Sequence, residues 1–303
     1  MSADERTVQF HCEGHRLIGV LSVPAQPGDT GMLIVVGGPQ YRAGSHRQFV
    51  QQARGMAAAG VPTLRFDVRG MGDSEGEPRN FEHISADIGA AIDTLLREAP
   101  TVRRVVLWGL CDGASAALLY LDDSGHDPRV QGLCLLNPWV RSEATLAATH
   151  VKHYYAQRLM QREFWHKLLR GQVGGSAVRG LARSTALVLR PQARTEASSA
   201  IVPFSLRMAR SWARFDGRIL LVLSENDYTA KEFVEAWQGP DWVAARLRPT
   251  TERLDVQSDH TFSQQVAQHQ VHSHCLRWIE GLAIPAVENG IPMTEKFHAN
   301  VCG

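Results

Sequence analysis

Short apolar runs alternate with segments of helical spacing over the first 140 residues. The runs are followed by glycine or a polar residue, which is typical of strands buried in a parallel sheet. Between them, apolar residues recur three and four positions apart, which predicts helices with one buried face. This alternation predicts an α/β fold, with a mostly parallel central sheet flanked by helices. After a hairpin of strands at 7–12 and 15–23 around Glu13-Gly14, we expect strands at 32–36, 63–66, 105–108 and 130–136, and helices at 46–59, 84–97 and 113–121.

The alternation stops near residue 140. From 141 to 216 no strand pattern is convincing, and 143–170 has helical spacing with bulky aromatic residues. The segment carries thirteen Lys and Arg against four Asp and Glu, a net charge of +9 that leaves −8 for the rest of the chain. This charge indicates either attraction to an anionic substrate or a solvated arginine-rich helix face, of which we favour the second. We predict a helical lid at 141–216, a core at 1–140 and 217–284, and a C-terminal tail at 285–303. Within the second part of the core we expect strands at 218–224 and within 246–256, and helices at 230–238 and 260–282.

Composition excludes several classes of protein. Of the 303 residues, 44% are hydrophobic and 21% charged, so disorder is excluded over most of the chain. The net charge of +1 indicates neither nucleic acid nor a membrane surface as a partner. The first residues are polar and no apolar run reaches 18 residues, so neither a secretory signal nor a transmembrane helix is predicted. A cytoplasmic location is expected, and the oligomeric state stays open.

The spacing of cysteine, histidine and glycine predicts no metal and no cofactor. The five cysteines, at 12, 111, 134, 275 and 302, include no CxxC pair, which argues against a disulfide framework or a zinc ribbon. No histidine pair has the H-E-x-x-H spacing of a zinc site. The Gly-rich segment 67–76 matches neither the Walker pattern nor G-x-G-x-x-G, so we interpret it as a turn bordering the site.

The sharpest local signal is Gly109-Leu110-Cys111-Asp112-Gly113, between a predicted strand and a predicted helix. This is the context of a nucleophile elbow, G-x-S-x-G, with cysteine in place of serine. The tight turn leaves no room for a β-carbon beside the nucleophile, which explains the flanking glycines. The helix N-terminus favours the thiolate of Cys111. A buried, inert cysteine is the alternative.

Two further candidates follow later strands in the order of a nucleophile–acid–histidine triad. Asp227 comes after the strand at 218–224, and His260 after the strand within 246–256. The carboxyl ends of parallel strands share one edge of the sheet, so these side chains are expected to meet Cys111 there. His260 would take the thiol proton, and Asp227 would orient the imidazole. Asp255 and Asp259 compete for the acid role.

Loops at the same edge supply candidate oxyanion and substrate contacts. The backbone N–H of Asp112 is one expected oxyanion donor, and that of Gln40 is the other, because Pro39 has no N–H. The Asp112 carboxylate either caps the helix N-terminus, which we favour, or points inward, where it would raise the pKa of the thiol. The candidate substrate contacts are Gly38, Tyr41, Trp139 and Tyr155.

Several strings in the chain are distinctive beyond the elbow. They are Val35-Val36-Gly37-Gly38-Pro39-Gln40-Tyr41-Arg42, Gly44-Ser45-His46-Arg47-Gln48-Phe49, Arg65-Phe66-Asp67, Arg69-Gly70-Met71-Gly72-Asp73-Ser74-Glu75-Gly76, Trp108-Gly109-Leu110-Cys111-Asp112 and Leu136-Asn137-Pro138-Trp139-Val140-Arg141. Through these strings the chain resembles the α/β-hydrolase superfamily over most of residues 8–282, and within it the type-one hydrolase found beside exosortase A systems. That resemblance implies an α/β-hydrolase fold and a link to exopolysaccharide production and protein sorting at the envelope. Cysteine elbows also occur in dienelactone-hydrolase-like enzymes, which this chain is similar to only at the elbow.

These observations lead to one main hypothesis and three alternatives. The main hypothesis is a cysteine-dependent hydrolase that cleaves an ester or thioester through an acyl-enzyme on Cys111, acting on a small or carrier-linked acyl substrate. The same acyl-enzyme would allow transfer to another acceptor instead of hydrolysis. A non-catalytic docking module of an envelope or exopolysaccharide system is the second alternative, and a redox-sensing Cys111 is the third.

Overall fold

The computed structural model describes residues 4–37, 40–140 and 202–282. In these ranges the strands form one eight-stranded sheet in the order β1-β2-β4-β3-β5-β6-β7-β8. β1 (Asp4–Cys12) and β2 (His15–Val23) form the expected hairpin, and β2 pairs antiparallel with β4. All the other neighbours are parallel. The parallel strands are β3 (Thr30–Val35), β4 (Thr63–Phe66), β5 (Arg104–Leu110), β6 (Val130–Leu136), β7 (Arg218–Ser224) and β8 (Thr251–Val256).

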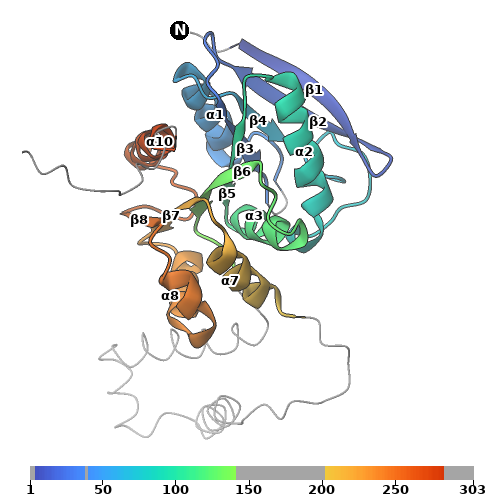
Figure 1. Ribbon diagram of the computed structural model, residues 1–303. Helices are drawn as coiled ribbons and strands as arrows, with labels where there is room; N and C mark the ends of the chain where they lie inside the picture. The colour runs from blue at the N-terminus through green and yellow to red at the C-terminus, as the bar shows by residue number, and fades with distance from the viewer. Residues whose placement is uncertain (1–3, 38–39, 141–201, 283–303) are drawn as a thin grey trace, which may run out of the picture.

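Helices cover both faces of the sheet (Figure 1). Side chains alternate along each strand, so that Leu33 and Val35 enter one apolar cluster while Met32 and Ile34 enter the other. The first cluster is covered by α2 (Ser85–Glu98), α3 (Asp112–Asp123), α7 (Phe204–Arg214), α8 (Tyr228–Gln238) and α9 (Val243–Arg246). The second is covered by α1 (Gln48–Ala58) and α10 (Gln265–Glu280). The predicted fold, a mostly parallel sheet flanked by helices, is confirmed.

β8 lies within the predicted range 246–256, after α9 and the turn that contains Pro249. One element boundary near the C-terminus differs from the prediction. α10 begins at Gln265 and not at 260. Before it, the Asp259 carboxylate accepts hydrogen bonds from the N–H groups of Thr261 and Ser263, which close a turn. His260 therefore lies in a loop between β8 and α10.

The end of the predicted lid packs as part of the core. Met208 and Trp212 on α7 are fully buried in the cluster that α3 also covers. Arg207 and Arg210, two of the thirteen cations of 141–216, pair with Asp122 at the end of α3. The remainder of the predicted lid, 141–201, and the predicted tail, 285–303, lie outside the described residues. No described helix is both long enough and apolar enough to span a bilayer.

Candidate active site

Cys111 forms the tight link between β5 and α3. Its backbone has φ 59° and ψ −126°, a conformation that residues other than glycine rarely adopt. Hydrogen bonds hold it there: the Cys111 N–H donates to the Leu136 carbonyl at 2.8 Å, and the Cys111 carbonyl accepts from Ala114 N at 3.0 Å. Strain of this kind persists only where the surrounding structure enforces it. It turns the half-buried Cys111 side chain toward the carboxyl edge of the sheet, where β6, β7 and β8 also end.

Three glycines allow this turn to pack closely. A Cβ on Gly109 would lie 2.5 Å from the backbone of Gly113, and one on Gly113 would lie 2.4 Å from the Val35 carbonyl oxygen. A Cβ on Gly37, after the end of β3, would lie 2.1 Å from the Gly113 nitrogen. Backbone atoms offer no way to relieve such contacts, so the glycines on both sides of Cys111 are required sterically. The loop after β3 is thereby placed directly against the start of α3.

His260 lies between Asp227 and Cys111. Its Nδ1 is 2.8 Å from Asp227 Oδ2, and its ring also hydrogen-bonds the Cys111 side chain. Because Nδ1 faces the carboxylate, the ring presents Nε2 to the sulfur. The hydrogen bonds to Asp227 and Cys111 raise the pKa of His260 to about 10, although burial acts in the opposite direction. The protonated ring is therefore strongly stabilised at neutral pH.

The Asp227 carboxylate is fixed by the helix that follows it. Asp227 is the N-cap of α8, and its two oxygens accept the N–H groups of Thr229 at 3.2 Å and Ala230 at 3.1 Å. Burial favours the neutral acid, but the hydrogen bond and charge of His260 and these two N–H groups lower the pKa of Asp227 below its usual range. The two competing carboxylates have other partners: Asp255 pairs with Arg253, and Asp259 caps its own turn.

Asn137 and Ser224 connect the ends of β6 and β7 to the loop that carries His260. The fully buried Asn137 donates from Nδ2 to the His260 carbonyl at 3.0 Å and to Ser224 Oγ at 2.9 Å. Its Oδ1 accepts the Ser224 N–H at 2.8 Å. Ser224 Oγ in turn donates to the Asp259 carbonyl at 2.9 Å. The carbonyl groups of Asp259 and His260 are therefore both hydrogen-bonded to side chains at the ends of β6 and β7.

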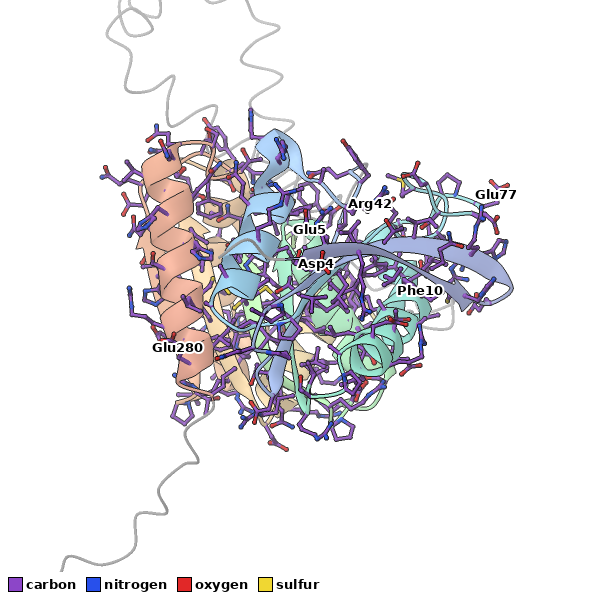
Figure 2. All side chains as sticks on the ribbon, turned by 90° about the horizontal axis from the view of Figure 1, so that it is seen from above. Asp4, Glu5, Phe10, Arg42, Glu77 and Glu280 are labelled. Carbon is purple, nitrogen blue, oxygen red and sulfur yellow. The ribbon has the colours of Figure 1, made fainter. Side chains whose placement is uncertain are left out.

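The Gly-rich segment 67–76 forms a turn that contacts the loop after β3. Asp67 is fully buried and accepts the Arg42 N–H at 2.7 Å and the Asp73 N–H at 3.0 Å. It also pairs with the Arg42 guanidinium, which reaches Asp73 as well. Arg42 and Glu77 both lie along the upper side of the molecule as drawn in Figure 2. The segment that carries Gln40 is thus held in place by a buried carboxylate.

Comparison with known proteins identifies the family. A family model described as serine aminopeptidase, S33, matches residues 33–235, about two thirds of the chain. The chain belongs to this family. It is therefore an α/β-hydrolase, although the residue at its elbow is Cys111 and not the serine of the family's description.

Solved structures show the same fold at low sequence identity. The esterase Pf2001 of Pyrococcus furiosus is 15% identical with a TM-score of 0.60, and the alignment covers 92% of this chain and 93% of that one. The α/β-hydrolase GrgF of Penicillium sp. sh18 is 18% identical with a TM-score of 0.59, covering 92% and 98%. Thiohydrolase apmlB of Arthrinium phaeospermum is 42% identical over 84 residues. That match spans only 26% of each chain.

The other predicted site residues of this α/β-hydrolase are distributed around the elbow. Asp112 is the first residue of α3 and so lies in the first turn of the helix that follows Cys111. The backbone N–H of Trp139 donates to the Cys111 carbonyl at 3.3 Å, which connects Trp139 to the elbow. Gln40 is partly buried in the loop after β3, and Tyr41 beside it is 54% exposed. Gly38 and Tyr155 lie outside the described residues.

The sequence analysis assigned no role to Asn137 or Ser224. A signal for them was present, since Asn137 directly follows a buried strand and Ser224 ends one. That is the same position, at the carboxyl edge of the sheet, that singled out Asp227. Within the described ranges, no three His, Cys, Asp or Glu side chains gather in a way that would hold a metal ion.

Proposed function

We propose that the protein is a cysteine-dependent α/β-hydrolase that cleaves an ester or thioester through an acyl-enzyme on Cys111. The observation that carries the proposal is the position of His260, hydrogen-bonded to Asp227 on one side and to Cys111 on the other. A nucleophile, a base within reach and a carboxylate that orients the base are the elements of covalent acyl transfer.

The first half-reaction forms the acyl-enzyme. The Cys111 proton passes to His260, whose protonated form is stabilised by Asp227, and the sulfur becomes the nucleophilic thiolate. The thiolate attacks the acyl carbonyl carbon, and the carbonyl electrons move onto oxygen. The backbone N–H groups of Asp112 and Gln40 are proposed to stabilise that oxyanion. As the tetrahedral intermediate collapses, the bond to the leaving oxygen or sulfur breaks, and the His260 proton passes to that atom.

The second half-reaction releases the acyl group. His260, now neutral, takes a proton from water, and the hydroxide equivalent attacks the thioester carbon. Collapse breaks the bond to Cys111, which leaves as thiolate, and the acyl group departs as a carboxylic acid. Asp227 keeps Nδ1 protonated throughout, so Nε2 alone exchanges protons with the reactants. An alcohol, amine or thiol that replaces water would turn the same cycle into acyl transfer.

The substrate class rests on the relatives and on sulfur chemistry. One relative is named as an esterase and another as a thiohydrolase, and a cysteine nucleophile exchanges readily with either leaving group. Within this class, the strings Gly37-Gly38-Pro39-Gln40-Tyr41-Arg42 and Gly109-Leu110-Cys111-Asp112 favour the hydrolase subtype associated with exosortase A systems. A carrier-linked acyl substrate in an envelope pathway is consistent with that subtype.

The deciding experiment is intact-mass analysis after brief exposure to p-nitrophenyl esters of increasing acyl length. We expect one acyl adduct per chain, mapped to Cys111 by peptide analysis, and absent from Cys111→Ala. His260→Ala should keep the fold, as judged by circular dichroism, but accumulate the adduct far more slowly. Repeating the reaction with an added amine or thiol separates hydrolysis from transfer, because transfer diverts the acyl group to the acceptor.

Absence of an adduct would contradict the proposal. If Cys111 also reacts with iodoacetamide no faster than the buried Cys12, the site has no activated thiol. The docking-module alternative would then be the better account of the elbow, because it requires the fold but no nucleophile.

A further inference from the structure

The sheet ends at β8, whose outer edge has no partner strand among the described residues. β8 is the last strand in the order of the sheet and pairs only with β7. Figure 1 shows it at the edge of the sheet, between α10 and α8. An open edge presents backbone N–H and carbonyl groups with which a strand of another chain can pair. The side chains of β8 therefore decide whether such pairing is blocked or favoured.

The hydrogen bonds between β7 and β8 show which residues of β8 face outward. The N–H of Glu225 donates to the Val256 carbonyl at 2.9 Å, so the backbone of Val256 faces β7. In a parallel ladder every second residue of a strand bonds to the same neighbour, so the other even-numbered residues of β8 face β7 as well. The backbone N–H and carbonyl groups of Arg253 and Asp255 consequently face away from the sheet.

The side chains of Arg253 and Asp255 lie on one face of the sheet, and Leu254 lies on the other. The two charged groups form an ion pair along the strand, with 2.8 Å between Arg253 Nη2 and Asp255 Oδ1, and they are 45% and 43% exposed. Exposed pairs of this kind contribute little to stability, so either charge can change partner at small cost. Leu254 is half-buried against the apolar cluster that α1 and α10 cover.

The order Arg253-Leu254-Asp255 is self-complementary in an antiparallel pairing. A two-fold axis at Leu254 places Arg253 of each chain opposite Asp255 of the other. Because the backbone groups of both residues face outward, each of these opposite pairs would exchange two backbone hydrogen bonds. The two Leu254 side chains would meet at the axis as a non-hydrogen-bonded pair, in which side chains lie closest. Charges on an edge strand ordinarily oppose pairing, but in this register opposite charges face each other.

Exposed apolar side chains are concentrated in the elements around β8. The described residues include six exposed large hydrophobic side chains, of which four lie in or directly after α8, α9 and α10. α8 and α9 cover one face of the sheet and α10 the other, so these side chains would add apolar contacts on both sides of a paired edge. The four are Tyr228, Val243, Leu247 and Val266.

We propose that the edge of β8 is a dimerisation surface, on which a second copy of this chain pairs antiparallel about Leu254 and continues the sheet. The self-complementary charges identify an identical strand as the occupant. The proposal does not depend on the activity of Cys111, and it is tested on the full chain without any substrate.

The test is sedimentation equilibrium of the full chain over a range of concentrations. We expect a monomer–dimer equilibrium with a Kd of about 1–100 µM, as for a small edge contact. Arg253→Asp and Asp255→Arg each bring like charges into opposition and should raise the Kd at least about tenfold. The double variant Arg253→Asp, Asp255→Arg restores opposite charges at both positions and should dimerise about as tightly as the wild type.

The deciding measurement mixes the two single variants. Neither variant can form the ion pair along its own strand, but the acidic strand of one would face the basic strand of the other. We expect a heterodimer at concentrations at which each variant alone is monomeric. Arg16→Glu is the matched control, because it breaks an equally exposed ion pair, with Glu75, in the hairpin at the other end of the sheet. It should change the Kd less than about twofold, and melting temperatures verify that every variant is folded.

Three results would overturn the proposal. A wild-type chain that is still monomeric at about 1 mM means that the edge does not pair. A dimer that persists unchanged in Arg253→Asp and Asp255→Arg uses another surface. A mixture of these two variants that stays monomeric means that the charges do not face each other between chains.

Discussion

The side-chain amide of Asn137 donates to the backbone carbonyl of His260 over 3.0 Å, although the two residues are 123 positions apart. Asn137 has φ 43°, a left-handed conformation that asparagine tolerates better than most residues. The loop that carries His260 is thus anchored to the end of β6, one residue beyond the strand. In the proposed mechanism, Asn137 acts through His260 and is a positioning residue.

Removing the Asn137 amide should slow acylation without unfolding the protein. Asn137→Gly keeps the left-handed backbone accessible but removes the side-chain hydrogen bond to the His260 carbonyl and the two to Ser224. We expect the rate of acyl-adduct formation to fall about ten- to hundredfold with little change in KM, because a misplaced base affects the reacting geometry and not binding. Pre-steady-state mass analysis measures this rate.

Ser224 allows a check on this interpretation. Ser224→Ala removes the second anchor of the loop, the hydrogen bond to the Asp259 carbonyl. Asn137→Gly and Ser224→Ala should shift the pH profile of acylation in the same direction. Equal losses of melting temperature with unchanged acylation rates would instead assign both residues a purely structural role.

The His260–Asp227 pair should make stability depend on pH. The pKa of His260 is raised from 6.5 to about 10, so the stabilisation is fully present below pH 6.5 and is lost as the pH rises through 10. The pKa of Asp227 is lowered from 3.8, so its contribution is present above that pH and lost as the pH falls below it. Urea unfolding of wild type and His260→Gln should differ by about 1–2 kcal/mol more at pH 6 than at pH 10. The same difference at both values would contradict the pairing.

Cys111→Ser should reduce esterase activity at least about a hundredfold. A serine hydroxyl holds its proton far more tightly than a thiol, so the stabilised imidazolium of His260 does not generate an alkoxide in its place. The melting temperature should change little because the side chains are similar in size. The matched control is Cys12→Ser, a buried cysteine distant in sequence from the elbow, which should leave kcat/KM unchanged. Full activity of Cys111→Ser would remove cysteine from the mechanism.

Gly113→Ala should destabilise the protein by about 1–3 kcal/mol, because its new methyl group would meet the Val35 carbonyl oxygen and the elbow would have to shift. Gly89→Ala is the control. Gly89 lies within α2, and a Cβ there would be 3.6 Å from the Tyr120 ring, which is an ordinary van der Waals contact. In a helix interior that change should stabilise by about 0.5–1 kcal/mol. Chemical denaturation measures both, and similar effects at the two glycines would show that the elbow is not sterically constrained.

Local pattern was sufficient for much of the fold. The bounds of β2, β4, β6 and β7 agree with the prediction. In β7, Ile219 to Leu223 form the continuous apolar run that a strand buried on both faces requires. The elbow around Cys111 was recognisable because its steric demands fall on residues within four positions of one another. The same local view failed at α10, where the turn closed by Asp259 delays the helix by five residues.

The sequence by itself determined the α/β fold, the elbow and the order in which Cys111, Asp227 and His260 occur. The tertiary structure decided which carboxylate faces His260, since Asp255 and Asp259 are closer to it along the chain than Asp227 but have other partners. It also placed α7 in the core, against α3. These outcomes depend on the register of β6, β7 and β8 and on the packing of α7 against α3. Both join residues too far apart in the sequence for any local periodicity to record them.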